Sequence, residues 1–141
     1  MARIHCAPVR EISTELLLRE FFSIPCVINS LYRSLNTRDY FYVNIPKEYT
    51  TQRGNMKFFY NKLLFLTNRY KDIYIELQKR NCKNIKPKTE WIKKIEFLLD
   101  KRKIPDNWIK DWSPDKNAID KSVWYLNNRM INKQGDNHEM L

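Results

Sequence analysis

The chain has 141 residues, the usual size of one compact domain, so a second hydrophobic core is excluded. Its 26 Lys and Arg outnumber its 16 Asp and Glu by ten charges, while a hydrophobic content of 43% excludes a wholly disordered basic tail. With only two glycines, a glycine-rich loop that cradles phosphate is also excluded.

The first predicted element is a helix that begins near Ser13, a residue type that caps helix N-termini. Pro25 lies inside this helix and is expected to kink or divide it, because proline lacks a backbone N–H donor. The tract 36–52 has no clear periodicity and is predicted to be a connecting loop. The apolar residues of the first helix repeat at spacings of four and three, on one face: Leu17, Phe21, Ile24, Ile28 and Leu31.

The clearest pattern in the chain predicts a second helix that is continuous from Met56 to Leu77. Its apolar stripe is expected to lie in the core: Met56, Phe59, Leu63, Leu66, Tyr70, Ile73 and Leu77. Its basic residues occupy other angles and are expected to form a partly basic outer surface: Lys57, Lys62, Arg69, Lys71, Lys79 and Arg80.

Two further helices are predicted in the last third of the chain. After a turn over 81–87, a short helix is expected to end near 103, with the basic run 101–103 in its last turn. Ser113 followed by Pro114 is typical of a helix start and predicts the fourth helix. Trp124 and Tyr125 fall within this helix and are predicted to be core residues. The sequence therefore predicts an all-α, single-domain helical bundle over 1–133, followed by a frayed polar tail over 134–141.

The charge is concentrated in the middle of the chain. Residues 53–103 hold 15 basic and five acidic residues, which accounts for the whole net charge of +10. Such an excess predicts a surface that binds double-stranded DNA or another polyanion. The alternative is a lysine-rich surface that only keeps the protein soluble.

Other partners and cofactors are not indicated. The sequence has no run of about 18 apolar residues and no hydrophobic stretch at its start, so we expect no membrane contact and an intracellular location. Cys6, Cys26 and Cys82 are odd in number and widely spaced, which predicts reduced thiols in a reducing compartment. No His or carboxylate cluster has metal-ligand spacing, so no metal site and no cofactor is predicted.

Two groups stand out as candidates for chemistry. Ala2 is small, so removal of Met1 is expected, and an α-amine with an ordinary pKa of about 8 can act as a nucleophile. Glu20 is followed by Phe21 and Phe22, an environment that could desolvate its carboxyl group.

Several segments, taken in order and spacing, carry a resemblance to a known family. They are 1–4 (Met-Ala-Arg-Ile), 20–25 (Glu-Phe-Phe-Ser-Ile-Pro), 58–66, 79–86, and the pair Ile104 and Pro105 with Asp111 and Pro114. Together they resemble the pyrimidine-dimer DNA glycosylases of the phage endonuclease V type. The resemblance spans most of the chain, and 87–103 looks like an added helix. It implies an all-α domain in which the N-terminal segment is threaded between helices.

The resemblance also implies a chemistry. In that family the N-terminal α-amine attacks the sugar C1′ of a damaged nucleotide and forms a Schiff base, and β-elimination then cleaves the strand. By this resemblance Ala2 matches the amine, and Arg3 and Lys86 match basic residues that face DNA. Arg53, Lys57 and Lys88 are expected to join the DNA-binding surface.

Three residues of this chain differ from the family at positions that the resemblance places in the family's catalytic pocket. Ser23 stands where the family has its catalytic glutamate, and Phe22 and Cys26 stand at flanking basic positions. A serine hydroxyl cannot carry a negative charge or relay protons as a carboxylate does. These three residues are therefore expected to form a degenerate pocket, now a packed surface or one that binds a protein partner.

Three hypotheses follow from these observations. The first is a DNA-binding member of this family whose glycosylase activity is lost or greatly reduced. The second is an active glycosylase and abasic-site lyase that uses the Ala2 amine, with Glu20 as the substitute carboxylate. The third is a non-catalytic structural or assembly protein of a virion or a ribonucleoprotein.

Overall fold

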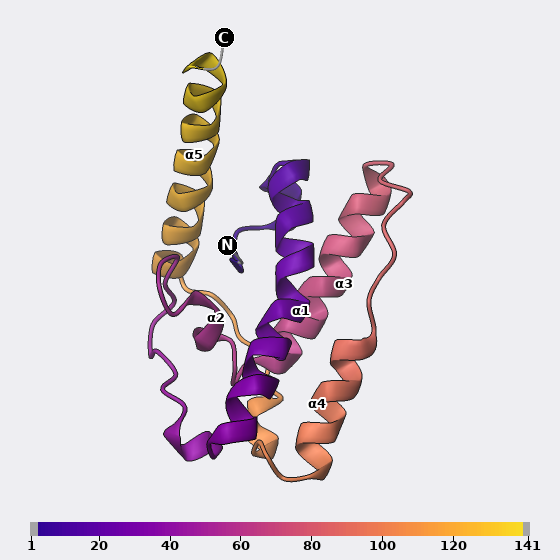
Figure 1. Ribbon diagram of the computed structural model, residues 1–141. Coiled ribbons are helices and arrows are strands. Elements are labelled where there is room, and N and C mark those ends of the chain that lie inside the picture. Colours follow the sequence, from indigo (N-terminus) through magenta and orange to yellow (C-terminus); the bar gives the residue numbers. More distant parts are fainter. Residues whose placement is uncertain (1–2, 140–141) are drawn as a thin grey trace.

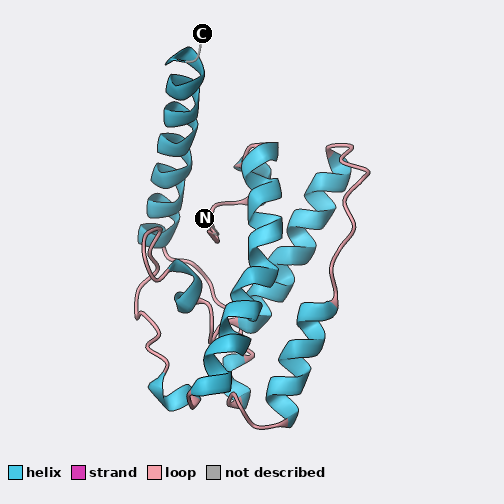
Figure 2. Cartoon of the chain, viewed as in Figure 1, coloured by secondary structure: helices cyan, strands magenta, loops and turns pink. Residues whose placement is uncertain are grey.

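The computed structural model describes the backbone of residues 3–139 and the side chains of residues 3–129. This part of the chain contains helices and loops and no strand (Figures 1 and 2), which confirms the predicted all-α class. No described helix is long and apolar enough to cross a membrane. The α-helices are α1 (Thr14–Thr37), α2 (Asn55–Phe58), α3 (Leu63–Lys79), α4 (Glu90–Asp100) and α5 (Lys116–Glu139), with short 3-10 helices η1 (Val9–Glu11), η2 (Tyr40–Tyr42) and η3 (Asp106–Trp108).

Helix α1 is the central element, and it packs against α3 and α4 (Figure 1). Its predicted cap is confirmed, because the backbone N–H of Leu16 donates to the Ser13 hydroxyl at 3.4 Å. Pro25 lies within the helix and does not divide it, although Figure 1 shows α1 changing direction about halfway along. Ile24 and Ile28 on either side of the proline are fully buried, so core packing holds both halves in place.

The predicted second helix is divided, and the prediction of one continuous helix from residue 56 to residue 77 is wrong. A turn over 59–62 separates α2 from α3. Phe58, Phe59 and Tyr60 are all at most 2% exposed, and a straight helix cannot turn three consecutive side chains toward one side because each is rotated by about 100°. The turn buries all three, and the apolar stripe continues in α3 as predicted.

Helix α4 ends earlier than the sequence predicts, so the basic run 101–103 follows the helix and does not form its last turn. The chain leaves α4 through Arg102, which has a left-handed backbone with φ of 54°. The backbone N–H of Lys103 donates to the Leu98 carbonyl at 2.8 Å, a pattern typical of a helix C-cap.

Helix α5 also differs from the prediction at its start. Asp115, two residues after the predicted cap Ser113, accepts a hydrogen bond from the Ala118 backbone N–H at 2.8 Å. Trp124 is 61% exposed and Tyr125 is half-buried, so the prediction that both are core residues is wrong. The helix continues to Glu139 through most of the predicted tail, and the fraying expected from residue 134 stays a prediction.

The N-terminal segment is part of the core. Ile4, His5, Cys6 and Ala7 are each at most 5% exposed, although they belong to no helix. An extended segment can be buried only if its backbone groups find partners, because an unpaired backbone N–H or C=O is costly away from water. Those partners position the candidate site.

Candidate functional site

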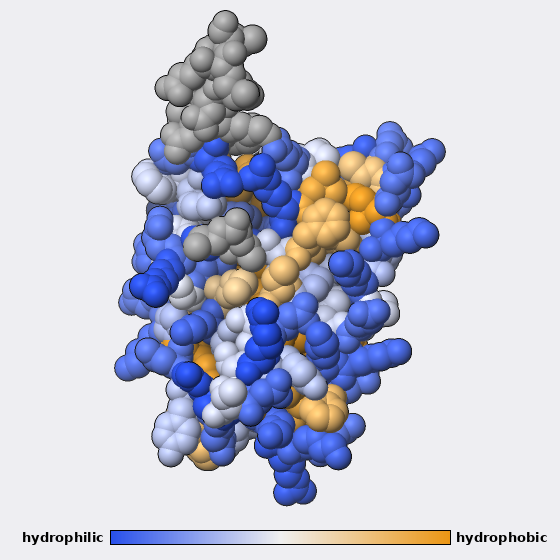
Figure 3. Space-filling view, viewed as in Figure 1, coloured by the Kyte–Doolittle hydropathy of each residue, from blue (hydrophilic) through white to orange (hydrophobic). Residues whose placement is uncertain are grey.

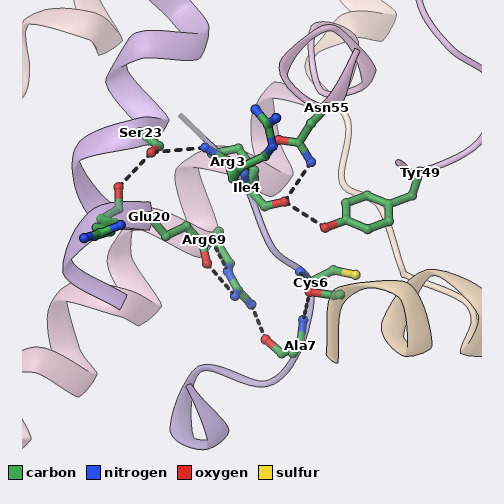
Figure 4. A network of polar contacts seen from close by, with 11 residues as sticks. Arg3, Ile4, Cys6, Ala7, Glu20, Ser23, Tyr49, Asn55 and Arg69 are labelled. Atoms are coloured by element: carbon green, nitrogen blue, oxygen red, sulfur yellow. Dashed lines mark hydrogen bonds and ion pairs between the residues drawn. The ribbon is translucent and has the colours of Figure 1, made fainter. Parts of the chain in front are cut away.

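Side chains from α2, α5 and the loop before α2 anchor the N-terminal segment (Figure 4). The Ile4 backbone N–H donates to Asn55 Oδ1 at 2.8 Å, and Asn55 Nδ2 donates back to the Ile4 carbonyl at 3.0 Å. The Tyr49 hydroxyl donates to the same carbonyl at 2.9 Å. Further along, the Cys6 backbone N–H donates to the Ser122 hydroxyl at 3.2 Å. Residues 4–6 are therefore fixed against the helices.

These contacts bring the N-terminal segment to Ser23. The Arg3 backbone N–H donates to Ser23 Oγ at 3.3 Å, and that hydroxyl donates to the Arg19 carbonyl at 2.7 Å (Figure 4). Ala2, the predicted source of the amine, lies outside the described residues. Its neighbour Arg3 contacts Ser23, the residue at the position that the family resemblance assigns to a catalytic glutamate.

Glu20 forms a buried ion pair with Arg69, which is 8% exposed, so the prediction that Arg69 belongs to the outer basic surface is wrong. Arg69 Nε donates to Glu20 Oε2 at 2.7 Å and Arg69 Nη2 to Oε1 at 3.0 Å, while Nη1 donates to the Ala7 carbonyl at 2.8 Å. Burial alone lowers the pKa of Arg69, but the charge and hydrogen bonds of Glu20 outweigh it and raise that pKa. The pair joins α1, α3 and the N-terminal segment.

The prediction that Lys62 belongs to the outer basic surface is also wrong, because Lys62 is only 8% exposed. Its Nζ donates to the Phe58 carbonyl at 2.9 Å and to Asn61 Oδ1 at 2.8 Å. Burial, helped by the nearby charge of Lys110, lowers the pKa of Lys62 to about 8. Of the predicted surface residues, Arg80 is half-buried, and the exposed ones are Lys57, Lys71 and Lys79.

The predicted DNA-binding residues fall into two groups. Arg3, Arg53 and Lys57 line a hollow of about 490 Å³ beside α2. Lys86 and Lys88 line a groove of about 360 Å³ between α1 and α4. Helix α1 borders both, with Ser30 at the hollow and Phe22, Cys26 and other residues of α1 at the groove. Figure 3 shows one face of the molecule as mostly hydrophilic, crossed by an apolar strip over α1 and α3.

The three residues of the expected degenerate pocket do not form one cluster. Ser23 is 7% exposed and contacts the N-terminal segment, whereas Phe22 is 56% exposed and lines the groove with Cys26. Successive helical residues point about 100° apart, which separates Ser23 from Phe22. The prediction of a packed surface at Phe22 is therefore wrong, and the binding of a protein partner there stays a prediction.

A small hollow beside the N-terminal segment contains residues that sequence reasoning missed. His5, Arg19, Tyr125 and Arg129 line it together with the predicted residues Arg3, Glu20 and Ser23. Arg19 had a signal in the sequence, because it lies one helical turn before Ser23. Arg129 and Tyr125 had none, because only the tertiary fold brings α5 to the first residues of the chain.

Burial lowers the pKa of His5, with further lowering by the charges of Arg69, Arg3 and Arg129 and an opposing effect of Glu20. The native state therefore binds a proton less readily than the unfolded chain, whose histidine pKa is about 6.5. We expect the free energy of unfolding to fall as pH drops below about 6.5, with a His5 share of at most about 1.4 kcal/mol per pH unit. Urea unfolding of the wild type and His5→Asn from pH 7.5 to 5 measures this share, and parallel pH profiles would contradict it.

The candidate site is an open surface that presents cations and hydrogen-bond donors. Among residues with described side chains, no group of three or more His, Cys, Asp or Glu could hold a metal ion. Comparison with models of known protein families found no match for this chain, and comparison with curated proteins found none either.

Proposed function

We propose that the protein binds double-stranded DNA as a divergent pyrimidine-dimer glycosylase whose glycosylase activity is lost or greatly reduced. The contact between the Arg3 backbone N–H and Ser23 Oγ, at 3.3 Å, carries this proposal. It supports an arrangement in which the start of the chain keeps the place that the family resemblance implies, beside a residue that cannot act as the carboxylate. Loss of a general acid or base typically costs about a hundredfold to ten-thousandfold in rate.

The cation pattern supports the DNA-binding half of the proposal. Arg53 and Lys57 are exposed at the hollow beside α2, and Lys86 and Lys88 are exposed at the groove between α1 and α4. Exposed cations can contact phosphates of a duplex backbone, and such contacts supply most of the affinity for nonspecific DNA.

The ion pair of Glu20 and Arg69 favours this hypothesis over the active enzyme. A substitute carboxylate at Glu20 would have to give up two hydrogen bonds of 2.7 and 3.0 Å to a buried guanidinium. Leaving that cation unpaired in the interior is strongly unfavourable. Glu20 is therefore better suited to hold the N-terminal segment in place than to move protons.

Charge reversal tests the DNA-binding surface. We expect Arg53→Glu/Lys57→Glu to weaken binding to a short duplex by about tenfold or more, because two phosphate-binding cations become anions. Fluorescence anisotropy at several salt concentrations measures the affinity, which for the wild type should fall as salt rises.

The matched control is Lys101→Glu/Lys103→Glu, which makes the same charge change in the turn after α4. An equal loss in this control would show that only net charge matters. An affinity that does not depend on salt would contradict a phosphate-binding surface and would favour the assembly-protein hypothesis.

A further inference from the structure

The groove of about 360 Å³ between α1 and α4 has a floor of aromatic side chains. Phe21, Tyr70 and Trp91 form this floor, and each of them is at most 6% exposed. Tyr70 stacks on Phe21 with ring centroids 4.3 Å apart, and the ring of Trp91 meets that of Tyr70 edge-on at 5.1 Å. A concave surface of hydrocarbon suits an apolar group, because contact removes apolar area on both sides from water.

One wall of the groove is a face of α1. Phe22, Pro25, Cys26 and Asn29 line it, and their spacings of three, four and seven residues place them on the same side of the helix. A single exposed apolar residue is ordinary on a protein surface. Phe22 differs because its half-exposed ring adjoins the apolar floor, with its centroid 5.9 Å from that of Phe21. The apolar floor therefore extends up this wall to the surface.

The opposite wall, which the chain forms just before α4, is fixed to the floor. The Lys88 backbone N–H donates to the Tyr70 hydroxyl at 2.8 Å, and Trp91 Nε1 donates to the Lys88 carbonyl at 2.7 Å. Two floor residues thus hold both polar groups of one peptide segment. The groove is formed without a ligand, so a partner would not have to order this wall on binding.

The rim of the groove carries a net positive charge, because Lys86, Lys88 and Lys94 line it against a single acidic residue, Glu90. Lys94 is engaged, since its Nζ donates to Asn29 Oδ1 at 2.6 Å. Lys86 and Lys88 are exposed, and neither forms an ion pair with a residue whose side chain is described. Their charges complement carboxylates on a partner.

This combination favours a protein partner over a nucleic acid. An apolar centre inside a charged rim is the usual anatomy of a protein–protein interface. A single strand of nucleic acid needs several ring faces on which successive bases stack, and here only Phe22 has a largely exposed ring. Ligand pockets span about 300–1,000 Å³, so a groove at the small end of that range suits a short segment with one bulky side chain.

We propose that this groove binds a short acidic segment of a partner protein, with one bulky apolar side chain against Phe22 and the aromatic floor and with carboxylates at Lys86 and Lys88. The inference goes beyond the proposed function and does not rest on it. The two lysines are shared with the proposed DNA-binding surface, whereas Phe22 belongs to the groove alone. Phe22 is therefore the residue that separates the two activities.

Binding of synthetic peptides to the full chain tests the groove. Each peptide has a central leucine, phenylalanine, tryptophan or, as the control, serine between glutamate flanks. In fluorescence anisotropy, we expect the best apolar peptide to bind about tenfold or more tightly than the serine peptide, because only an apolar side chain gains by burial. At saturation it should slow alkylation of the exposed Cys26 thiol, followed by mass spectrometry, and not that of Cys82, which lies outside the groove.

Phe22→Ser should weaken binding of the apolar peptide by about tenfold or more and leave the serine peptide unchanged. The matched control is Phe41→Ser, which removes an exposed phenylalanine outside the groove and should bind as the wild type does. Both side chains are exposed, so both variants should fold normally, which a thermal melt checks. Lys86→Gln/Lys88→Gln should weaken every peptide and reduce the salt dependence of binding.

Equal binding of the apolar and serine peptides, or equal binding by the wild type and Phe22→Ser, would overturn the groove as a peptide site. A single-stranded oligonucleotide that protects Cys26 when no peptide does would also overturn it, in favour of a nucleic acid.

The proposed function can fail separately, because Phe22→Ser should leave the affinity for a DNA duplex unchanged. If the apolar peptide binds and the duplex does not, the groove stands and the proposed function fails. If the duplex binds with a salt-dependent affinity and no peptide protects Cys26, DNA binding stands and the peptide site is overturned.

Discussion

Ser23→Glu is expected to give the protein a covalent adduct with abasic-site DNA under borohydride, at a rate at least about a hundredfold above the wild type. The Arg3 backbone N–H is 3.3 Å from Ser23 Oγ, so a carboxylate at this position would lie close to the start of the chain. It would also face Arg3, Arg19 and Arg129, whose charges favour the ionised form. A carboxylate there could stabilise the cationic Schiff base and transfer protons.

Ser23→Gln is the matched control, since it has nearly the same shape as the glutamate variant without its charge. Mass spectrometry must first show that Met1 has been removed, because only then is the Ala2 amine free. An equal adduct in the wild type would mean that catalysis never depended on this position. No adduct with correctly processed Ser23→Glu would contradict the proposed relationship between Ser23 and the amine.

Glu20→Ala is expected to lower the free energy of unfolding by about 3–5 kcal/mol, because it leaves the buried guanidinium of Arg69 without its anion. For a chain of this size, that loss corresponds to a fall in melting temperature of about 10 °C or more. Urea unfolding followed by circular dichroism gives the free energy directly.

Glu15→Ala is a suitable control, because Glu15 also pairs with an arginine on α1 but is about half exposed. The exposed pair should contribute less than about 1 kcal/mol. If Glu20→Gln kept full stability and yet abolished an adduct formed by the wild type, Glu20 would be the catalytic carboxylate and its structural role would be secondary.

Local patterns in the sequence predict a large part of the fold. The Ser13 cap, the stripe of α1 and the stripe of α3 depend on residues within one or two helical turns, so periodicity and capping identify them. The break at 59–62 was missed because Phe59 fits the helical stripe equally well. The need to bury Phe58 and Tyr60 as well is a property of the assembled core.

The candidate site could be predicted only in part, for a similar reason. The resemblance to a known family predicted roles for Ser23 and Arg3, and the fold brings these two residues into contact. It could not reveal that Arg69 is buried, because its partner Glu20 lies 49 residues earlier in the chain. The exposure of Trp124 was also missed, because the buried face of α5 consists of residues four apart, Ala118, Ser122 and Leu126, and Trp124 lies on another face.

The anchoring of the N-terminal segment has a consequence for the order in which the chain folds. The Cys6 backbone N–H has its partner in Ser122, 116 residues later, so the segment around Cys6 cannot complete its hydrogen bonds until α5 has been synthesised. Until then, Asn55 and Tyr49 can bind the Ile4 backbone, but the Cys6 backbone N–H has no Ser122 hydroxyl to bind. Docking of the segment around Cys6 is therefore a late event in biosynthesis, and a truncation that removes α5 would leave the Cys6 backbone N–H without this partner.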